Sequence, residues 1–125
     1  MKLDVKESLS LFVVDVLLFQ RSIRSQNADL QVIKEELVKA TLFCEEAFIA
    51  LQQAPAAMGF KKAIRTCLDQ MQKANYWLRI LHEAKIGDRK KVGLLIEESN
   101  RIKENLGQVR NTTKKRLIPT QGVAA

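Results

Sequence analysis

Apolar residues recur along this chain at alternating spacings of three and four, which is the period of one face of an α-helix. The most regular series consists of Phe60, Ile64, Cys67, Met71, Ala74, Leu78 and Leu81. A second series, with the spacing of a heptad repeat, consists of Leu30, Ile33, Leu37, Ala40, Cys44, Ala47 and Leu51. Each series predicts a long helix with one buried stripe.

Less regular series predict two further helices, one near each end of the chain. The first contains Phe12, Val16, Phe19 and Ile23. The last contains Val92, Leu95, Ser99, Ile102, Leu106, Val109 and Thr113. β-Branched residues within 11–17 also allow a strand there, but the flanking helical period favours a helix. The four predicted helices span about residues 6–24, 29–53, 56–85 and 88–116.

Turn and capping residues separate these segments. Asn27 or Asp29 can cap the second helix, and Pro55 ends it because proline lacks a backbone donor. Gly87 ends the third helix, and Asp88 is placed to cap the fourth.

Four amphipathic helices with short connections can bury their stripes together. The sequence therefore predicts an all-α fold, an antiparallel up-and-down four-helix bundle. We expect residues 1–118 to form this single domain and residues 119–125 to form a flexible tail, because Pro119 does not continue a helix. A chain of 125 residues is long enough to bury a core without disulfides or a metal.

The sequence carries no catalytic or metal-binding motif. It lacks a phosphate-binding glycine loop, a His-Glu-x-x-His helix and a Ser/His/Asp grouping. Cys44 and Cys67 have no ligand spacing, and His82, the only histidine, is more typical of a packed residue than of a base. We expect no enzyme activity, no cofactor and no metal. Carboxylates of facing helices are the one enzymatic alternative, and bound metal would reveal it.

The apolar run near the N-terminus, residues 11–19, is not typical of a targeting segment. Asp15 interrupts it, and no small-residue cleavage site follows. The run is also too short to span a bilayer. We interpret it as a buried helix of a cytoplasmic protein that does not associate with membranes.

Charge is unevenly distributed along the chain. Residues 1–56 carry six Lys/Arg and eight Asp/Glu, whereas residues 57–125 carry fifteen and six. The basic half predicts a surface that binds a polyanion, and nucleic acid is the commonest polyanion for such a domain. A solvated basic surface that serves solubility is an equally good interpretation of the charge alone.

Three clusters contain most of this positive charge. They are Lys61, Lys62 and Arg65, then Arg89, Lys90 and Lys91, and finally Arg110 with Lys114, Lys115 and Arg116. The helix dipole by itself accounts for cations near a helix C-terminus, as in the last cluster, but it disfavours three cations in the first turn of the fourth helix. We expect these side chains to contact phosphates without base specificity.

The stretch NYWLRIL, residues 75–81, holds the only tryptophan and the only tyrosine. At 100° per residue, Trp77 falls at the edge of the buried stripe, whereas Tyr76 and Ile80 face outward. We expect the outward pair to join outward apolar residues of the first helix in a contact between subunits of a homo-oligomer. This predicted contact consists of Tyr76, Ile80, Leu11, Val14 and Leu18. The alternative is that Tyr76 stacks on the bases of a single-stranded nucleic acid.

The segment KANYWLRILHEAKIGD, followed by LLIEESNRIKENLGQVRNTTKKRL, resembles a bacterial four-helix-bundle family. That family is encoded in intervening sequences of large-subunit ribosomal RNA genes, and it includes the accessory variability determinant (Avd) of diversity-generating retroelements. The likeness rests on the block Tyr76-Trp77-Leu78-Arg79 and on Leu95-Ile96-Glu97-Glu98 before a basic end. It covers residues 28–117 in pattern and is most specific over residues 74–116.

One departure separates the branches of this family. The ribosomal branch commonly carries Ser-Ile-Pro-x-Asn-Ile-Ala-Glu-Gly where its second helix ends, and this chain has TLFCEEAFIALQQAP instead. Avd-type members also lack that signature, so the resemblance favours the Avd branch.

The resemblance to Avd implies a homopentameric, ring-like assembly that binds RNA or DNA. It also implies a reverse transcriptase as partner during mutagenic copying of a template RNA. Arg79, Lys62, Arg65 and the two clusters of the fourth helix are then the candidates for phosphate contact. The ribosomal branch would instead imply a protein-interaction module without a reverse transcriptase, whose basic surface meets an acidic protein.

Overall fold

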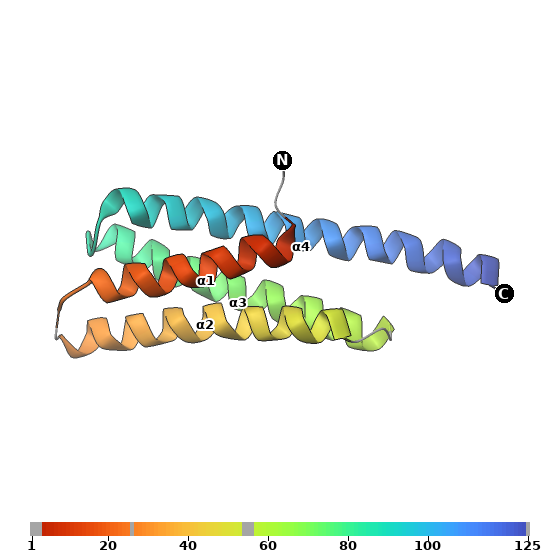
Figure 1. The fold of residues 1–125 in the computed structure, drawn as a ribbon, viewed down its shortest axis with the longest axis horizontal. Helices are drawn as coiled ribbons and strands as arrows, with labels where there is room; N and C mark the ends of the chain where they lie inside the picture. The colour runs from red at the N-terminus through yellow and green to blue at the C-terminus, as the bar shows by residue number, and fades with distance from the viewer. Residues whose placement is uncertain (1–3, 26, 54–56, 125) are drawn as a thin grey trace.

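All regular secondary structure in the described part of the chain is α-helix. The computed structural model describes residues 4–25, 27–53 and 57–124, with side chains throughout except at residues 57–58 and 112–124. Its four helices are α1 (Val5–Ser22), α2 (Ala28–Gln53), α3 (Ala57–Glu83) and α4 (Arg89–Ala124) (Figure 1). The predicted all-α class and the four predicted helices are confirmed, and no strand forms at residues 11–17.

Local capping chemistry explains several of the helix ends. The carboxylate of Asp4 accepts a hydrogen bond of 2.7 Å from the backbone N–H of Glu7 and so caps α1. After α3, the chain turns through Gly87 at φ +78°, a left-handed conformation that favours glycine. Asp88 then caps α4 as predicted, because its carboxylate accepts from the backbone N–H groups of Lys90 and Lys91. Pro55 lies outside the described residues.

Each helix packs against two others. α1 lies against α2 and α4, and α3 lies against the same two helices. This packing is compatible with a four-helix bundle. The core contains the predicted stripes, with Phe12, Leu37, Ile64, Met71, Leu78, Leu81, Val92 and Leu106 among its fully buried side chains.

The core also contains residues that the spacing pattern did not identify. Phe48 and Thr41 of α2 are buried, and so is Asn75 of α3. The Thr41 hydroxyl donates to the backbone carbonyl of Leu37, one turn earlier, which satisfies it within its own helix. Asn75 instead bonds across to α4, so its burial depends on another element.

The last helix is longer than the sequence indicates. α4 continues to Ala124, past Pro119, whereas the predicted end lies near Arg116. Its C-terminal part extends beyond the ends of the other three helices (Figure 1). The flexible tail expected at residues 119–125 stays a prediction.

Candidate nucleic-acid interface

Polar side chains join α3 to α4 along their line of contact. The side-chain amide of Asn75 donates to the Ser99 hydroxyl at 2.7 Å and to the Asn100 carbonyl oxygen at 3.1 Å. The Lys103 ammonium donates to the Gln72 carbonyl oxygen at 2.9 Å. In these pairs the residue number falls along α3 from 75 to 72 while it rises along α4 from 99 to 103. The two helices therefore run in opposite directions where they touch.

This register places further cations along the same line. Residues seven apart on a helix lie on nearly the same face, two turns from each other. From Gln72, this spacing leads to Arg65 and Arg79 on α3. From Lys103, it leads to Arg110 in one direction and to Arg89, fourteen residues away, in the other. We call the resulting surface the basic seam; it also includes Lys61, one turn before Arg65, and consists of Lys61, Arg65, Arg79, Arg89, Lys103 and Arg110.

The basic seam is open and lacks paired carboxylates. Five of its cations are exposed, and Lys103 is half-buried. Among the described side chains the structure records one ion pair, Lys39–Glu36 on α2, so no carboxylate lies within 4.0 Å of a seam cation. Gly93 and Gly107 of α4 lie beside the seam, and a methyl group added at either would meet no atom within 4 Å. Asp69 and Glu83 of α3 follow Arg65 and Arg79 by four residues and so lie on the same side of the helix, but neither carboxylate forms an ion pair with a seam cation.

Lys103 carries the clearest electrostatic signature of this surface. Partial burial lowers the pKa of its ammonium below the ordinary value, and the positive charge of Arg79 lowers it further. Two like charges therefore lie near each other, and neither forms an ion pair. A phosphate placed between them would remove this repulsion.

The predicted phosphate-binding residues divide into three groups. Lys61, Arg65, Arg79, Arg89 and Arg110 lie on the basic seam. Lys62, Lys90 and Lys91 are also exposed, but their helical positions turn them away from it. Lys114, Lys115 and Arg116 belong to α4, and their side chains lie outside the described residues.

The seam unites residues that the sequence analysis kept apart. Lys61 lies in the first turns of α3, whereas Arg89 is the first residue of α4, beyond the other end of α3. Clusters of adjacent residues guided the prediction, and Lys103 was missed because it stands alone between Ile102 and Glu104. Its spacing of seven from Arg110 was the available signal.

Most members of the predicted subunit contact are exposed, while the contact itself stays a prediction. Leu11, Val14 and Leu18 of α1 are 50%, 51% and 59% exposed, and Tyr76 is 54% exposed. Ile80 is half-buried, so its expected full exposure is wrong. Tyr76 and Trp77 precede it by four and three residues, and side chains at these spacings are neighbours that cover it in part.

Two carboxylates meet beside this α1 surface. Asp15 of α1 and Glu98 of α4 lie close enough to interact. Burial raises the pKa of the Glu98 carboxyl, and the negative charge of Asp15 raises it further, while Arg101 opposes the shift. The contact of α1 with α4 therefore carries a like-charge pair of its own.

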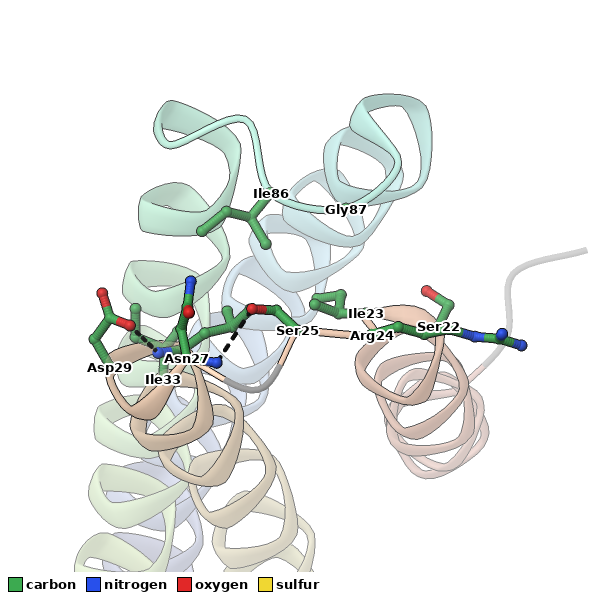
Figure 2. Close-up of a pocket in the computed structure, with 10 residues that line it drawn as sticks. Ser22, Ile23, Arg24, Ser25, Asn27, Asp29, Ile33, Ile86 and Gly87 are labelled. Carbon is green, nitrogen blue, oxygen red and sulfur yellow. Dashed lines mark hydrogen bonds between the residues drawn. The ribbon is translucent and has the colours of Figure 1, made fainter.

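A pocket of about 370 Å³ lies where the α1–α2 and α3–α4 connections meet (Figure 2). Apolar atoms of Ile23, Ile33 and Ile86 form part of its wall, and Asn27 and Asp29 stand at its polar side. The Asp29 carboxylate is occupied by a hydrogen bond from the backbone N–H of Leu30.

The two cysteines are free, buried and opposite each other. The Cys44 thiol donates to the backbone carbonyl of Cys67 at 3.3 Å, and the Cys67 thiol donates back to that of Cys44 at 3.7 Å. The neighbouring Cys67 thiol and burial together raise the pKa of the Cys44 thiol. Within the described residues no three His, Cys, Asp or Glu side chains gather as a metal site would require.

Neither the search for membrane-spanning helices nor the comparison with known proteins assigns a role to this surface. No helix in the described part of the chain has the length and apolar character needed to cross a bilayer. Comparison with protein-family models, with curated proteins and with solved structures finds no match to this chain.

Proposed function

We propose that this chain is a non-enzymatic protein that binds nucleic acid through the basic seam of α3 and α4. We also propose that the four helices form an antiparallel up-and-down bundle and that identical bundles assemble into a ring. In this proposal the assembly is cytoplasmic. It is the accessory partner of a reverse transcriptase that copies a template RNA mutagenically. No cofactor takes part.

The observation that carries the proposal is the row of exposed cations on the basic seam, none of which forms an ion pair. Successive members such as Lys103 and Arg110 are two helical turns apart, about 10 Å along the axis. Such a row offers charge to a polymer with a regular phosphate backbone and offers no set of base-reading groups.

The assembly and the polymerase partner rest on other features. The ring is supported by the exposed apolar face of Leu11, Val14 and Leu18, which a subunit contact would cover. The partnership with a reverse transcriptase is what the resemblance of Tyr76-Trp77-Leu78-Arg79 to Avd implies. A reverse-transcriptase gene beside the gene for this chain would support that partnership, and a location inside a ribosomal RNA gene would oppose it.

The phosphate-binding role is tested by neutralising the seam. The variant Arg65→Gln/Arg79→Gln/Lys103→Gln is compared with the wild type by fluorescence anisotropy on a labelled structured RNA, over a series of salt concentrations. Each lost phosphate contact should lower the log–log salt slope by about 0.7–0.9, so the triple variant should lose about two to three units of slope.

A matched control removes the same charge elsewhere. Lys6→Gln/Arg21→Gln/Lys39→Gln neutralises three exposed cations of α1 and α2. This control should keep nearly all of the affinity and slope, because its cations lie away from α3 and α4. Equal losses in the two triple variants would show that only net charge matters and would remove the seam from the proposal.

A protein-interaction module is the second candidate, in accord with the ribosomal branch of the family. The exposed apolar face of α1 favours it, since such a face suits a protein better than a polyanion. The basic surface would then meet an acidic protein. Failure of the wild type to co-sediment with structured RNA at modest salt would favour this candidate over nucleic-acid binding.

A further inference from the structure

Tyr76 lies beside the basic seam on α3, one turn from Arg79. Gln72 precedes it by four positions and Arg79 follows it by three, and residues at these spacings are neighbours on a helix surface. Its ring stands edge-on to that of Trp77, with 5.1 Å between ring centroids, so one aromatic ring holds the other in place. The ring of Tyr76 is 54% exposed.

Lys103 and Gln72 extend this group across to α4. The hydrogen bond of 2.9 Å from Lys103 to Gln72 holds the ammonium beside the residue that neighbours Tyr76. Arg79, on the other side of Tyr76, is close enough for its charge to act on Lys103. An aromatic face and two cations without a paired acid thus occupy one small area of the α3–α4 surface.

We propose that Tyr76, Arg79 and Lys103 form a binding site for one nucleotide of a single-stranded nucleic acid. The base stacks on the exposed ring of Tyr76, and the phosphate lies between Arg79 and Lys103. This inference rests on the proposed function, because it specifies which form of nucleic acid the basic seam binds.

The aromatic ring decides between single and double strands. A base in a duplex has both faces covered by its neighbours in the stack, so a protein ring cannot cover it without breaking the stack. An unpaired base has a free face, and stacking on a protein ring stabilises it whatever its identity. Cations alone would bind either form, and only the placement of Tyr76 among them favours the unpaired strand.

The same geometry bears on the earlier interpretation of Tyr76 as a subunit contact. Two like-charged side chains beside an aromatic ring would disfavour burial against another copy of this basic chain, unless that copy supplied carboxylates there. A phosphate supplies the missing negative charge directly. The apolar residues of α1 lie on another helix and do not depend on Tyr76.

The test uses the wild-type chain with three fluorescent probes. Two are single strands of twelve nucleotides, one of deoxythymidine and one of uridine, and the third is a hairpin duplex of equal charge. At least one of the two single strands should bind more tightly than the duplex. Tyr76→Ala should weaken single-strand binding roughly 10- to 100-fold and leave duplex binding unchanged, as expected for loss of one stacked base. Tyr76→Phe should bind like the wild type, because it keeps the ring.

Trp77 provides a second readout. It is the only tryptophan in the chain, and its ring contacts that of Tyr76. A base that stacks on Tyr76 should therefore change the tryptophan emission on titration with unlabelled oligomer. The duplex should produce little change, and the signal should be lost in Tyr76→Ala.

A matched control separates loss of this ring from loss of any exposed aromatic group. Phe43→Ala removes an exposed aromatic side chain from α2 and should leave single-strand affinity unchanged. Arg79→Gln and Lys103→Gln should each lower the salt slope for the single strand by about 0.7. Circular dichroism should show unchanged helical content in all of these variants.

The outcomes distinguish this site from the proposed function. If the wild type binds oligomers and Tyr76→Ala binds them equally well, the nucleotide site is wrong while nucleic-acid binding stands. If Tyr76→Ala changes the oligomeric state and not the affinity, Tyr76 is a subunit contact and the site is again wrong. If the wild type binds neither single strand nor duplex, the site and the proposed function fail together.

Discussion

The side-chain amide of Asn75 donates a hydrogen bond of 2.7 Å to the hydroxyl of Ser99, inside the contact between α3 and α4. The Ser99 hydroxyl in turn donates to the backbone carbonyl of Ile96 at 2.7 Å. Both side chains are buried, and the described residues contain no buried side-chain nitrogen or oxygen without a hydrogen-bond partner. This pair fixes the register of α3 on α4 and thereby the alignment of the basic seam.

Replacing Asn75 by Ala should lower the free energy of unfolding by about 1–3 kcal/mol, because Ser99 and Asn100 lose a donor within a packed contact. Urea denaturation followed by circular dichroism measures this change. Gln108→Ala, an exposed change on α4, should stay within about 0.5 kcal/mol of the wild type. A double-mutant cycle with Ser99→Ala should give a coupling of about 0.5–1.5 kcal/mol, and additivity of the two single effects would contradict the pairing.

Gly87→Ala should destabilise the turn between α3 and α4. Gly87 has φ +78°, and an added methyl would lie 2.9 Å from the ring of Phe19. The left-handed conformation alone costs a non-glycine residue about 1–2 kcal/mol, and the contact with α1 adds to it. The melting temperature should therefore fall. Gly93→Ala is the matched control, since it meets no atom within 4 Å and should be neutral or stabilising by up to about 1 kcal/mol.

Asp15→Asn should raise the thermal stability at pH 7 and change it little at about pH 3. The pKa of Glu98 is raised in the folded protein by burial and by Asp15. A carboxyl whose pKa is raised on folding holds its proton more tightly in the folded state, so stability falls as the pH rises through that pKa. Below the unfolded pKa both states are protonated, and the effect is absent.

An NMR titration of Glu98 checks the cause of this pH dependence. Its pKa should move toward the ordinary value in Asp15→Asn and should stay raised in Asp69→Asn, which removes an exposed carboxylate of α3. An unchanged Glu98 pKa in Asp15→Asn would show that burial alone produces the shift.

Leu11→Lys/Val14→Lys/Leu18→Lys should convert the proposed oligomer into monomers. The three side chains form one exposed face of α1, and three ammonium groups there would remain hydrated rather than enter an interface. Analytical ultracentrifugation at micromolar concentration measures the result. Val32→Lys/Leu42→Lys/Ile49→Lys makes the same change on exposed positions of α2 and should leave the assembly intact. A monomeric wild type would refute the ring.

Cys44 and Cys67 should resist alkylation in the folded protein. Both thiols are buried, and the raised pKa of Cys44 leaves little of the reactive thiolate. Modification by iodoacetamide, followed by mass spectrometry, should be at least about 100-fold slower than in urea, because it requires an opening of the fold. Equal rates in both conditions would show that the contact between α2 and α3 opens freely.

The spacing of apolar residues determined the number of helices, most of their ends to within a few residues and most of the core, but not the end of α4. Helical period depends only on neighbours within a few turns, so Leu78 and Leu81 could be assigned to the core from the sequence. The cap of α4 by Asp88 was equally local, because a cap involves the adjacent backbone. The predicted end of α3 at Gly87 is wrong, since α3 ends at Glu83 and Lys85, at φ +57°, is the first left-handed residue after it. The outward placement of Tyr76 followed from the same period.

The tertiary structure decided which helix faces meet, and with them the candidate site. Asn75 looked like an ordinary polar residue until Ser99 was placed against it, and Lys103 was an isolated cation until Gln72 and Arg79 lay beside it. The partial burial of Ile80 likewise depends on the shapes of the neighbouring side chains, which the ideal helical angle of 100° per residue does not describe. Periodicity indicates that a stripe is buried but not which stripe it meets or in which register. Those choices come from packing between residues far apart in the sequence, and the basic seam is their product.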